Sequence, residues 1–209
     1  MADSNLPEEI RNKKLLVVEG KDDIGFFVEV LKKQNILGVY VTGLDGKNRF
    51  NEELPRFTKI SGFSNITHFG IIRDKDDKSQ NDAFKSVANT LRKKTNLQNI
   101  PTKHGQFATG KPRIGIFIMP GDSIEGNMLE DLCLKTVEKH EAMSCVNEFI
   151  SCVSTLKTKP RNMSKAKTHA FLAVQQELAN SIGLASEKGY WDFSSPVINE
   201  LRQFLNNLK

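Results

Sequence analysis

The stretch Leu15–Asp23, LLVVEGKDD, decides the fold because a buried segment ends there in acidic residues. Four consecutive apolar residues are typical of a strand that is covered on both faces of a parallel sheet. Gly20 closes the strand, and the apolar positions after it recur at helical spacing as far as Lys33. We therefore expect a strand over residues 14–20, followed by a helix that Asp22 caps.

The same alternation of strand and helix continues along the chain. Further strands are predicted over residues 38–46, 67–77 and 112–121, and the helix after the second strand is disturbed at Pro55. Strands that alternate with helices form a mostly parallel sheet with helices on its faces. The sequence therefore predicts an α/β fold with a mostly parallel sheet of about four strands flanked by helices.

The character of the sequence changes after Gly121, where only helices are predicted. We expect residues 1–13 to form a flexible arm and residues 14–133 the α/β core. Residues 134–209 are expected to be a helical C-terminal extension that packs on this core.

Composition bounds the class of protein. The chain has 209 residues, a hydrophobic fraction of 38% and a net charge of +5, which permits a polyanionic partner without requiring one. No apolar run approaches the ~20 residues of a membrane helix, and the polar start lacks a signal-peptide core. We expect a cytoplasmic protein with no membrane association.

Cysteines and histidines give no sign of a disulfide framework or a zinc site. The three cysteines form no C-x-x-C pair, and the four histidines lack zinc-ligand spacing. His169 falls within a predicted helix, where packing or capping is the expected role.

Acidic residues lie at or just beyond the carboxyl ends of three predicted strands, and they are the candidate site: Glu19 and Asp23, then Asp74 and Asp76, then Asp122, Glu125, Glu130 and Asp131. Ligands of open parallel sheets bind outside the carboxyl ends of the strands. Acids at helix N-termini are common without any ligand, so a single pair would mean little. Three groups together repel strongly unless a cation lies among them, and Mg²⁺ prefers oxygen ligands. The pattern predicts Mg²⁺ or Mn²⁺, as one ion or as two.

These motifs resemble the Toprim fold, a metal-binding domain shared by topoisomerases, bacterial primases and overcoming-lysogenization-defect (OLD) nucleases. Glu19-Gly20 and Asp74-x-Asp76 match the two Toprim motifs. The spacing of Glu19 and Asp23 is similar to that of OLD-type nucleases, whose later Glu is best matched by Glu130, with Glu125 as the alternative. The segments EGNMLEDLCL, SKAKTHAFLA and GYWDF further resemble a family of small stand-alone Toprim-like proteins of unknown function.

The resemblance implies metal-dependent breaking or joining of phosphodiester bonds, with Glu19 in a catalytic role and the five acids Glu19, Asp23, Asp74, Asp76 and Glu130 as metal ligands. OLD-type nucleases also use a lysine beyond the acidic core. Lys165 is the candidate here and Lys167 the alternative. Such a lysine could neutralise developing charge or help to activate the nucleophile. No motif positions a tyrosine as a nucleophile, which argues against a topoisomerase.

Nucleic-acid contacts are predicted at three basic residues. The segment Gly105–Pro112, GQFATGKP, differs from a phosphate-binding loop because it ends in proline and precedes a strand. We expect a hairpin-like loop there, whose Lys111 and Arg113 contact a phosphate backbone. Lys21, beside the first acidic pair, is the third candidate.

Two other functions compete with a nuclease. Haloacid-dehalogenase phosphatases also end a strand in Asp-x-Asp, with the first Asp as nucleophile, but at their first strand and with small residues where this chain has Asp77 and Lys78. Alternatively, the protein is a non-catalytic metal-binding partner of an ATPase. OLD-type nucleases carry an ATPase on the same chain, whereas this chain has no P-loop, so ATP-driven control would need a separate subunit. The sequence leaves the choice between DNA and RNA, the mode of cleavage and the oligomeric state open.

Overall fold

The apolar runs of the sequence form a five-stranded sheet. The structure is a computed structural model that describes residues 6–44 and 47–209. The strand order is β2-β1-β3-β5-β4, with these bounds: β1 Lys14–Val18, β2 Val39–Gly43, β3 His68–Asp74, β4 Gln106–Phe107 and β5 Arg113–Met119. Strands β2, β1, β3 and β5 are parallel, and β4 pairs antiparallel with β5. The predicted α/β fold with a mostly parallel sheet is confirmed. The short β4 is additional, because the loop before β5 turns back as a hairpin.

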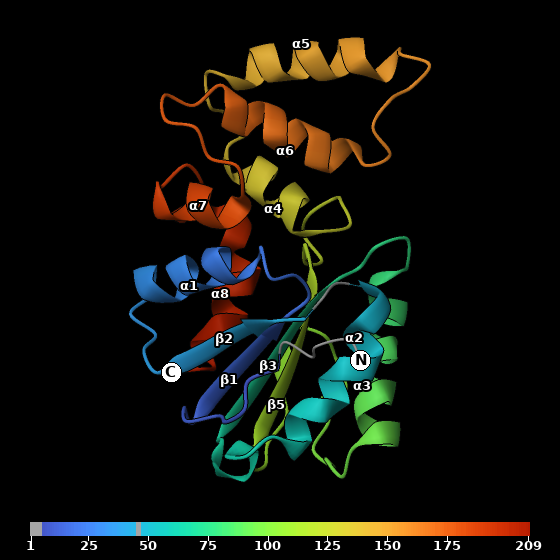
Figure 1. Cartoon of the computed structure of the whole chain (residues 1–209), viewed down its shortest axis with the longest axis vertical. Coiled ribbons are helices and arrows are strands. Elements are labelled where there is room, and N and C mark those ends of the chain that lie inside the picture. The colour runs from blue at the N-terminus through green and yellow to red at the C-terminus, as the bar shows by residue number, and fades with distance from the viewer. Residues whose placement is uncertain (1–5, 45–46) are drawn as a thin grey trace.

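Alternate side chains of the strands build a hydrophobic core on each face of the sheet. Leu15 and Val17 pack with α2 (Lys47–Glu53) and α3 (Gln80–Lys94). Leu16 and Val18 pack on the other face, with α1 (Ile24–Lys33) and α8 (Asn199–Asn206). Figure 1 shows the sheet between these two layers. The helix after β2 changes at Leu54, next to Pro55, into the 3-10 helix η1 (Leu54–Lys59), and a second 3-10 helix, η2 (Phe63–Asn65), precedes β3.

The remaining helices cover the carboxyl ends of the strands, in the upper half of Figure 1. They are α4 Leu129–Thr136, α5 Met143–Ser154, α6 Met163–Ala173 and α7 Ile182–Glu187, and the 3-10 helix η3 (Pro196–Ile198) leads into α8. Helix α7 lies tightly against α1, since a Cβ atom added to Gly25 would come 2.6 Å from the Cα atom of Gly183. Helices α4 and α6 lie beside the sheet edge at which β1 and β3 end.

The segment predicted as a flexible arm is attached to the domain at several of its described residues, among them Ile10, Asn12 and Lys13. Residues 1–5 of this segment lie outside the described residues. The main-chain N–H of Ile10 donates to the carbonyl oxygen of Ser61 at 2.8 Å, and the Ile10 side chain is buried. Within the described ranges, no helix is long and apolar enough to cross a membrane.

Candidate functional site

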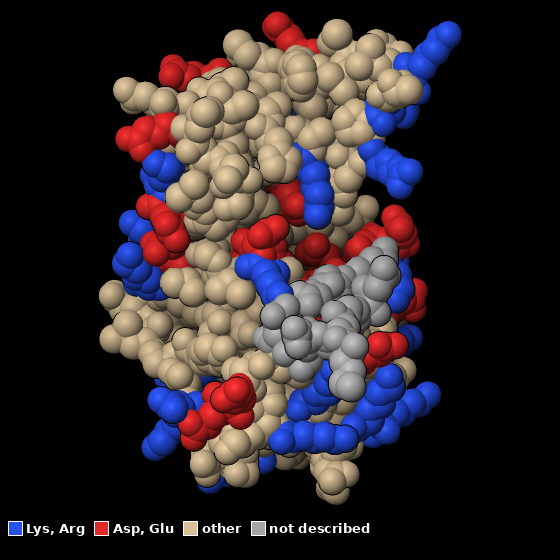
Figure 2. All heavy atoms as spheres, in the orientation of Figure 1, with Lys and Arg blue, Asp and Glu red and all other residues tan. Residues whose placement is uncertain are grey.

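A cavity of about 390 Å³ lies at the carboxyl ends of β1 and β3, and all five predicted metal ligands line it. We call it the acidic cavity. Figure 2 shows Asp and Glu side chains gathered where the upper helices meet the sheet. The turn after β1, the end of β3 and the turn after it, and helices α4 and α6 supply its ionisable side chains: Glu19, Asp22, Asp23, Asp74, Asp76, Glu130, Lys165 and His169. The structure therefore brings together residues that lie up to 150 positions apart, from Glu19 to His169.

Glu19 is fixed by β3, the neighbouring strand. Its Oε2 atom accepts the main-chain N–H of Asp74 at 3.3 Å. The buried Arg73 guanidinium lies 3.6 Å from the same oxygen. Because β1 and β3 are parallel neighbours in the sheet, their ends coincide and this contact follows from the register. The carboxylate of Glu19 is thus held in one position, and the Arg73 guanidinium partly neutralises its charge.

Asp23 takes the position predicted for Asp22 at the start of α1. Its Oδ2 atom accepts the N–H of Gly20 at 3.0 Å, which turns the carboxylate back toward the end of β1. Asp23 is the N-cap residue, but its side chain caps no helical N–H, so the predicted capping role of Asp22 is wrong. Asp22 is exposed and lines the acidic cavity instead. The reason is the tight turn after Gly20, which shifts the helix start to Ile24.

The turn after β3 is tied to the loop before α4. The Oδ1 atom of Asp74 accepts the N–H of Leu129 at 3.2 Å, and the N–H of Asp76 donates to the carbonyl oxygen of Asn127 at 3.1 Å. Asp76 has a φ of 56°, a left-handed conformation that is uncommon outside glycine. Such conformations persist where the surrounding structure fixes them, often at functional sites. These bonds set the start of α4 and thereby place Glu130.

Glu130, rather than Glu125, is the third acidic position of the acidic cavity. Glu125 is exposed and lines a different cavity, together with Lys135 and Lys167. Asp131 next to Glu130 points away, since its Oδ2 atom accepts the N–H groups of Asn127 and Met128 at 2.7 and 3.2 Å. Asp131 therefore holds the loop before α4 and lines the other cavity, whereas Glu130 lines the acidic cavity.

Lys165 is the lysine that faces the acids. Its Nζ atom lies 3.5 Å from Oε1 of Glu130, across the gap between α6 and α4. Lys167 lines the other cavity, beside Glu125, which follows from its place two residues further along the helix. The charge of Glu130 raises the pKa of Lys165, with smaller contributions from Asp74 and Asp23. Lys165 therefore stays protonated throughout the neutral range.

The crowded carboxyl groups raise one another's pKa. Burial raises the pKa of Asp23 to about 7, and the charges of Glu130 and Glu19 add to this effect, while the Gly20 N–H and Lys165 oppose it. Burial and the neighbouring acids also raise the pKa of Asp74 well above its ordinary value. A site of this kind holds more negative charge than burial tolerates, so it favours bound protons or bound cations.

The three predicted nucleic-acid contacts do not all lie near the acidic cavity. Lys21 is exposed in the turn between Glu19 and Asp23. Arg113 begins β5, whereas the acids lie beyond the other end of the sheet, beside Met119. At roughly 3.3 Å per residue this strand separates Arg113 from that edge by about 20 Å. Lys111 precedes Arg113 and lies at the same far end.

The cavity contains residues that sequence reasoning gave another role. His169 lines the acidic cavity and is exposed, rather than packing inside the protein. It lies one helical turn after Lys165 on the same face of α6, and that i, i+4 spacing was the signal available in the sequence. Asn162 caps α6, with its Oδ1 atom accepting the N–H of Lys165 at 2.9 Å, and also lines the cavity. No pattern in the sequence points to Asn162.

The chemistry of these side chains fits a hard divalent cation. All five acids offer carboxylate oxygens, and several such ligands are what Mg²⁺ and Mn²⁺ prefer. The buried acids with raised pKa values are the physical sign of unbalanced negative charge. In the described part of the chain, only the separate group of His104, Asp122 and Glu200 has three candidate ligand atoms that all lie within 4.8 Å of one another. The acids of the cavity are spread more widely, so they do not form a single closed cage.

Comparison with known proteins places the chain in a family. No curated protein matches it. Two solved structures resemble it at 14% sequence identity: the C-terminal region of the Burkholderia pseudomallei OLD protein, with a TM-score of 0.47, and that of the Xanthomonas campestris pv. campestris OLD protein, with a TM-score of 0.41. The first match covers 96% of this chain and 100% of that one, and the second covers 95% of each. Residues 13–209 match the model of the family described as "Protein of unknown function (DUF3226)", and the chain belongs to this family.

Proposed function

We propose that the protein binds Mg²⁺ or Mn²⁺ in the acidic cavity and carries out phosphodiester chemistry on nucleic acid, as a nuclease of the Toprim type. The observation that carries the proposal is the meeting of acids from three distant segments, after β1, after β3 and at the start of α4, in one cavity. The Glu-Gly and Asp-x-Asp motifs resemble Toprim in the same positions. The described residues Glu19, Asp23, Asp74, Asp76 and Glu130 would hold the metal.

A divalent ion there would stabilise negative charge on the phosphoryl oxygens and favour an ionised water as nucleophile. The protein's own side chains have separate tasks. Glu19 is held by the Asp74 N–H and by Arg73, so its carboxylate is positioned before any substrate arrives. Lys165 reaches the rim of the cavity from α6, with 59% of its side chain exposed. Because its pKa is raised, Lys165 would act as a fixed cation that binds a substrate phosphate rather than as a general base.

A metal titration is the first test, since every catalytic version of the proposal requires it. Isothermal calorimetry with Mn²⁺ should show binding by the wild-type protein and its loss in Asp74→Ala and Glu19→Ala. The exposed neighbour Asp77, changed to Asn, is the matched control. If the wild-type protein binds neither Mn²⁺ nor Mg²⁺, the proposal is wrong.

Nucleic-acid cleavage is the second test. Supercoiled DNA and single-stranded RNA, incubated with the protein and Mn²⁺, should be nicked in a way that Asp74→Ala abolishes. An aryl-phosphate substrate in parallel tests the phosphatase alternative, which predicts release of the aryl alcohol and intact nucleic acid. Metal binding without either reaction would favour the third reading, a metal-binding partner of a separate ATPase.

A further inference from the structure

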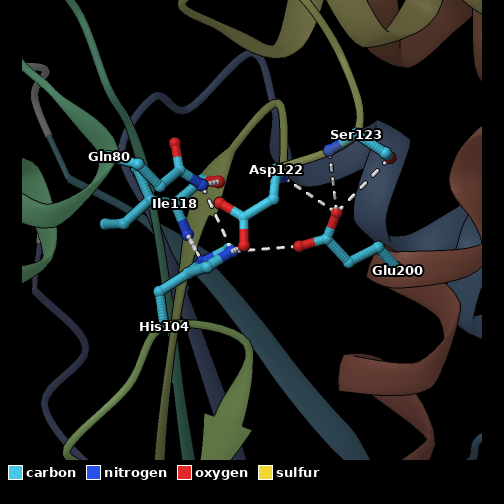
Figure 3. Close-up of polar contacts among 6 residues, drawn as sticks. All are labelled: Gln80, His104, Ile118, Asp122, Ser123 and Glu200. Carbon is cyan, nitrogen blue, oxygen red and sulfur yellow. Dashed lines mark hydrogen bonds and ion pairs between the residues drawn. The ribbon is translucent and has the colours of Figure 1, made fainter.

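A second polar cluster lies at the end of β5, outside the acidic cavity. We call it the Glu200 cluster, and it comprises His104, Asp122, Ser123 and Glu200 (Figure 3). His104 precedes β4, Asp122 and Ser123 follow β5, and Glu200 lies in the first turn of α8. The cluster therefore joins the C-terminal helix to the loop that runs from β5 to α4.

The hydrogen bonds of His104 leave its ring without a free lone pair. Its Nδ1 atom accepts the main-chain N–H of Ile118 at 3.0 Å, so Nδ1 is unprotonated. The neutral ring then carries its proton on Nε2, which lies 3.0 Å from Oε1 of Glu200 and donates to it. The amide nitrogen of Gln80 also lies 3.2 Å from this Nε2 atom, and it donates to the Ile118 carbonyl oxygen at 2.9 Å. A metal on Nε2 would have to displace that proton and create an imidazolate. His104 is thus a donor to Glu200, and neither a metal ligand nor a general base.

Glu200 acts as an acceptor on both of its oxygens. While Oε1 receives the His104 proton, Oε2 accepts the main-chain N–H of Asp122 at 2.9 Å and that of Ser123 at 3.4 Å. A Cβ atom added to Gly121 would come 2.7 Å from the same Oε2 atom, so the loop passes close to the carboxylate. The His104 hydrogen bond and these N–H groups lower the pKa of Glu200, consistent with a carboxylate that stays ionised.

The far end of this loop carries the acidic cavity. There the carbonyl oxygen of Asn127 accepts the N–H of Asp76. The N–H of Leu129, the first residue of α4, donates to Oδ1 of Asp74. The loop is therefore held at two points, by Glu200 at its start and by the turn after β3 at its end. Six positions separate Ser123 from Leu129, and Glu130 comes next.

We propose that Glu200 is a positioning residue for the acidic cavity: by holding the start of the β5–α4 loop against α8, it fixes where Glu130 and the Asp74–Leu129 hydrogen bond lie. The effect on metal affinity rests on the proposed metal binding. The effect on the loop does not, and it can be measured without any ion.

Glu200→Gln is the informative change, because glutamine keeps the length of the side chain but puts an NH₂ group where one oxygen accepted a hydrogen bond. In the metal-free protein, we expect hydrogen exchange over residues 121–131 to become about tenfold faster. Mn²⁺ binding measured by calorimetry should weaken about ten- to a hundredfold, as is usual when a group that orients metal ligands is removed. The melting temperature reports any general loss of stability, which would speed exchange in β1 and β3 as well.

Asp122→Asn is the matched control. The Asp122 side chain is 69% exposed and its Oδ2 atom lies 3.6 Å from Nε2 of His104, but the main-chain N–H that Glu200 accepts is kept in this variant. We expect this variant to exchange and to bind Mn²⁺ like the wild-type protein. If instead both variants lose one Mn²⁺ equivalent while the remaining affinity is unchanged, the cluster itself binds metal and the proposal is overturned. Unchanged loop exchange in Glu200→Gln also overturns it, whereas a wild-type protein that binds no Mn²⁺ counts against the proposed function alone.

Discussion

The main-chain N–H of Asp74 donates to Oε2 of Glu19 at 3.3 Å, although 55 positions separate the two residues. The pairing of β1 with β3, in which Val17 is opposite Ile71, brings the two strand ends to the same height. Asp74 in turn accepts the N–H of Leu129 at the start of α4. One chain of hydrogen bonds therefore links the three acidic segments, and the variants below test its parts separately.

Glu130 and Glu125 make a matched pair for metal binding. Glu130→Gln should weaken Mn²⁺ binding about tenfold or more, since it removes a charge that the acidic cavity supplies. Glu125→Gln, in the loop before α4 and lining another cavity, should leave the Mn²⁺ affinity unchanged. Calorimetric titration of both variants checks this. Equal weakening by both changes would show that only net charge matters, and would contradict a site at Glu130.

Lys165 and Lys167 form a second pair, on one helix. Lys165→Met should lower the rate of nucleic-acid nicking about a hundredfold, because it removes a cation that would bind the substrate phosphate. Mn²⁺ binding should persist in this variant, since Lys165 competes with a metal for Glu130 rather than helping it. Lys167→Met should nick at the wild-type rate. The comparison uses initial rates at saturating Mn²⁺, and equal loss in both variants would point to general charge effects.

The stability of the metal-free protein should fall as pH rises from 5 to 8. Burial raises the pKa of Asp23 to about 7, above its ordinary value of 3.8, so the folded state binds a proton in this range that the unfolded state has released. Stability then decreases with pH by at most about 1.4 kcal/mol per pH unit for one such proton. Urea unfolding at a series of pH values with chelator present measures it.

Asp23→Asn is the control for this pH dependence, because asparagine does not titrate. The variant should show a smaller decrease in the free energy of unfolding between pH 5 and 8 than the wild-type protein. Saturating Mn²⁺ should stabilise the wild-type protein more at pH 8 than at pH 5, since protons compete with the metal. A wild-type protein that gains stability with pH in chelator would contradict the assignment of Asp23.

Gly25→Ala should destabilise the protein although alanine favours helices. The added Cβ atom would come 2.6 Å from the Cα atom of Gly183, so α7 would have to move away from α1. Overpacking of this kind costs about 1–3 kcal/mol, against a gain of about 1 kcal/mol in helix propensity. Val28→Ala, at an exposed position of the same helix, should change the free energy of unfolding by about 0.5 kcal/mol or less. Urea unfolding compares the two variants.

The pattern of apolar runs predicted most of the fold. The strands β1, β3 and β5 are continuous apolar segments buried on both faces, and such segments allow few alternatives. The short β4 escaped prediction because two residues, Gln106 and Phe107, carry no periodicity. The predicted N-cap of α1 lies one residue too early. Asp22 and Asp23 are the same residue type, so the sequence does not distinguish them as N-caps, and only the turn after Gly20 decides that Asp23 takes this position.

The sequence by itself determined that acids follow the strands, because the strand period and the position of Gly20 can be read from local residues alone. It left Glu125 and Glu130 open, and likewise Lys165 and Lys167, since each pair differs only in the direction of its side chains. The tertiary structure decided both, through the hydrogen bonds that fix the start of α4 and through the face of α6 that lies over the sheet. The tertiary structure also shows that Lys111 and Arg113 lie at the opposite end of the sheet from the acids. Local patterns set what each segment forms, whereas the packing of segments far apart in the chain sets which side chains meet.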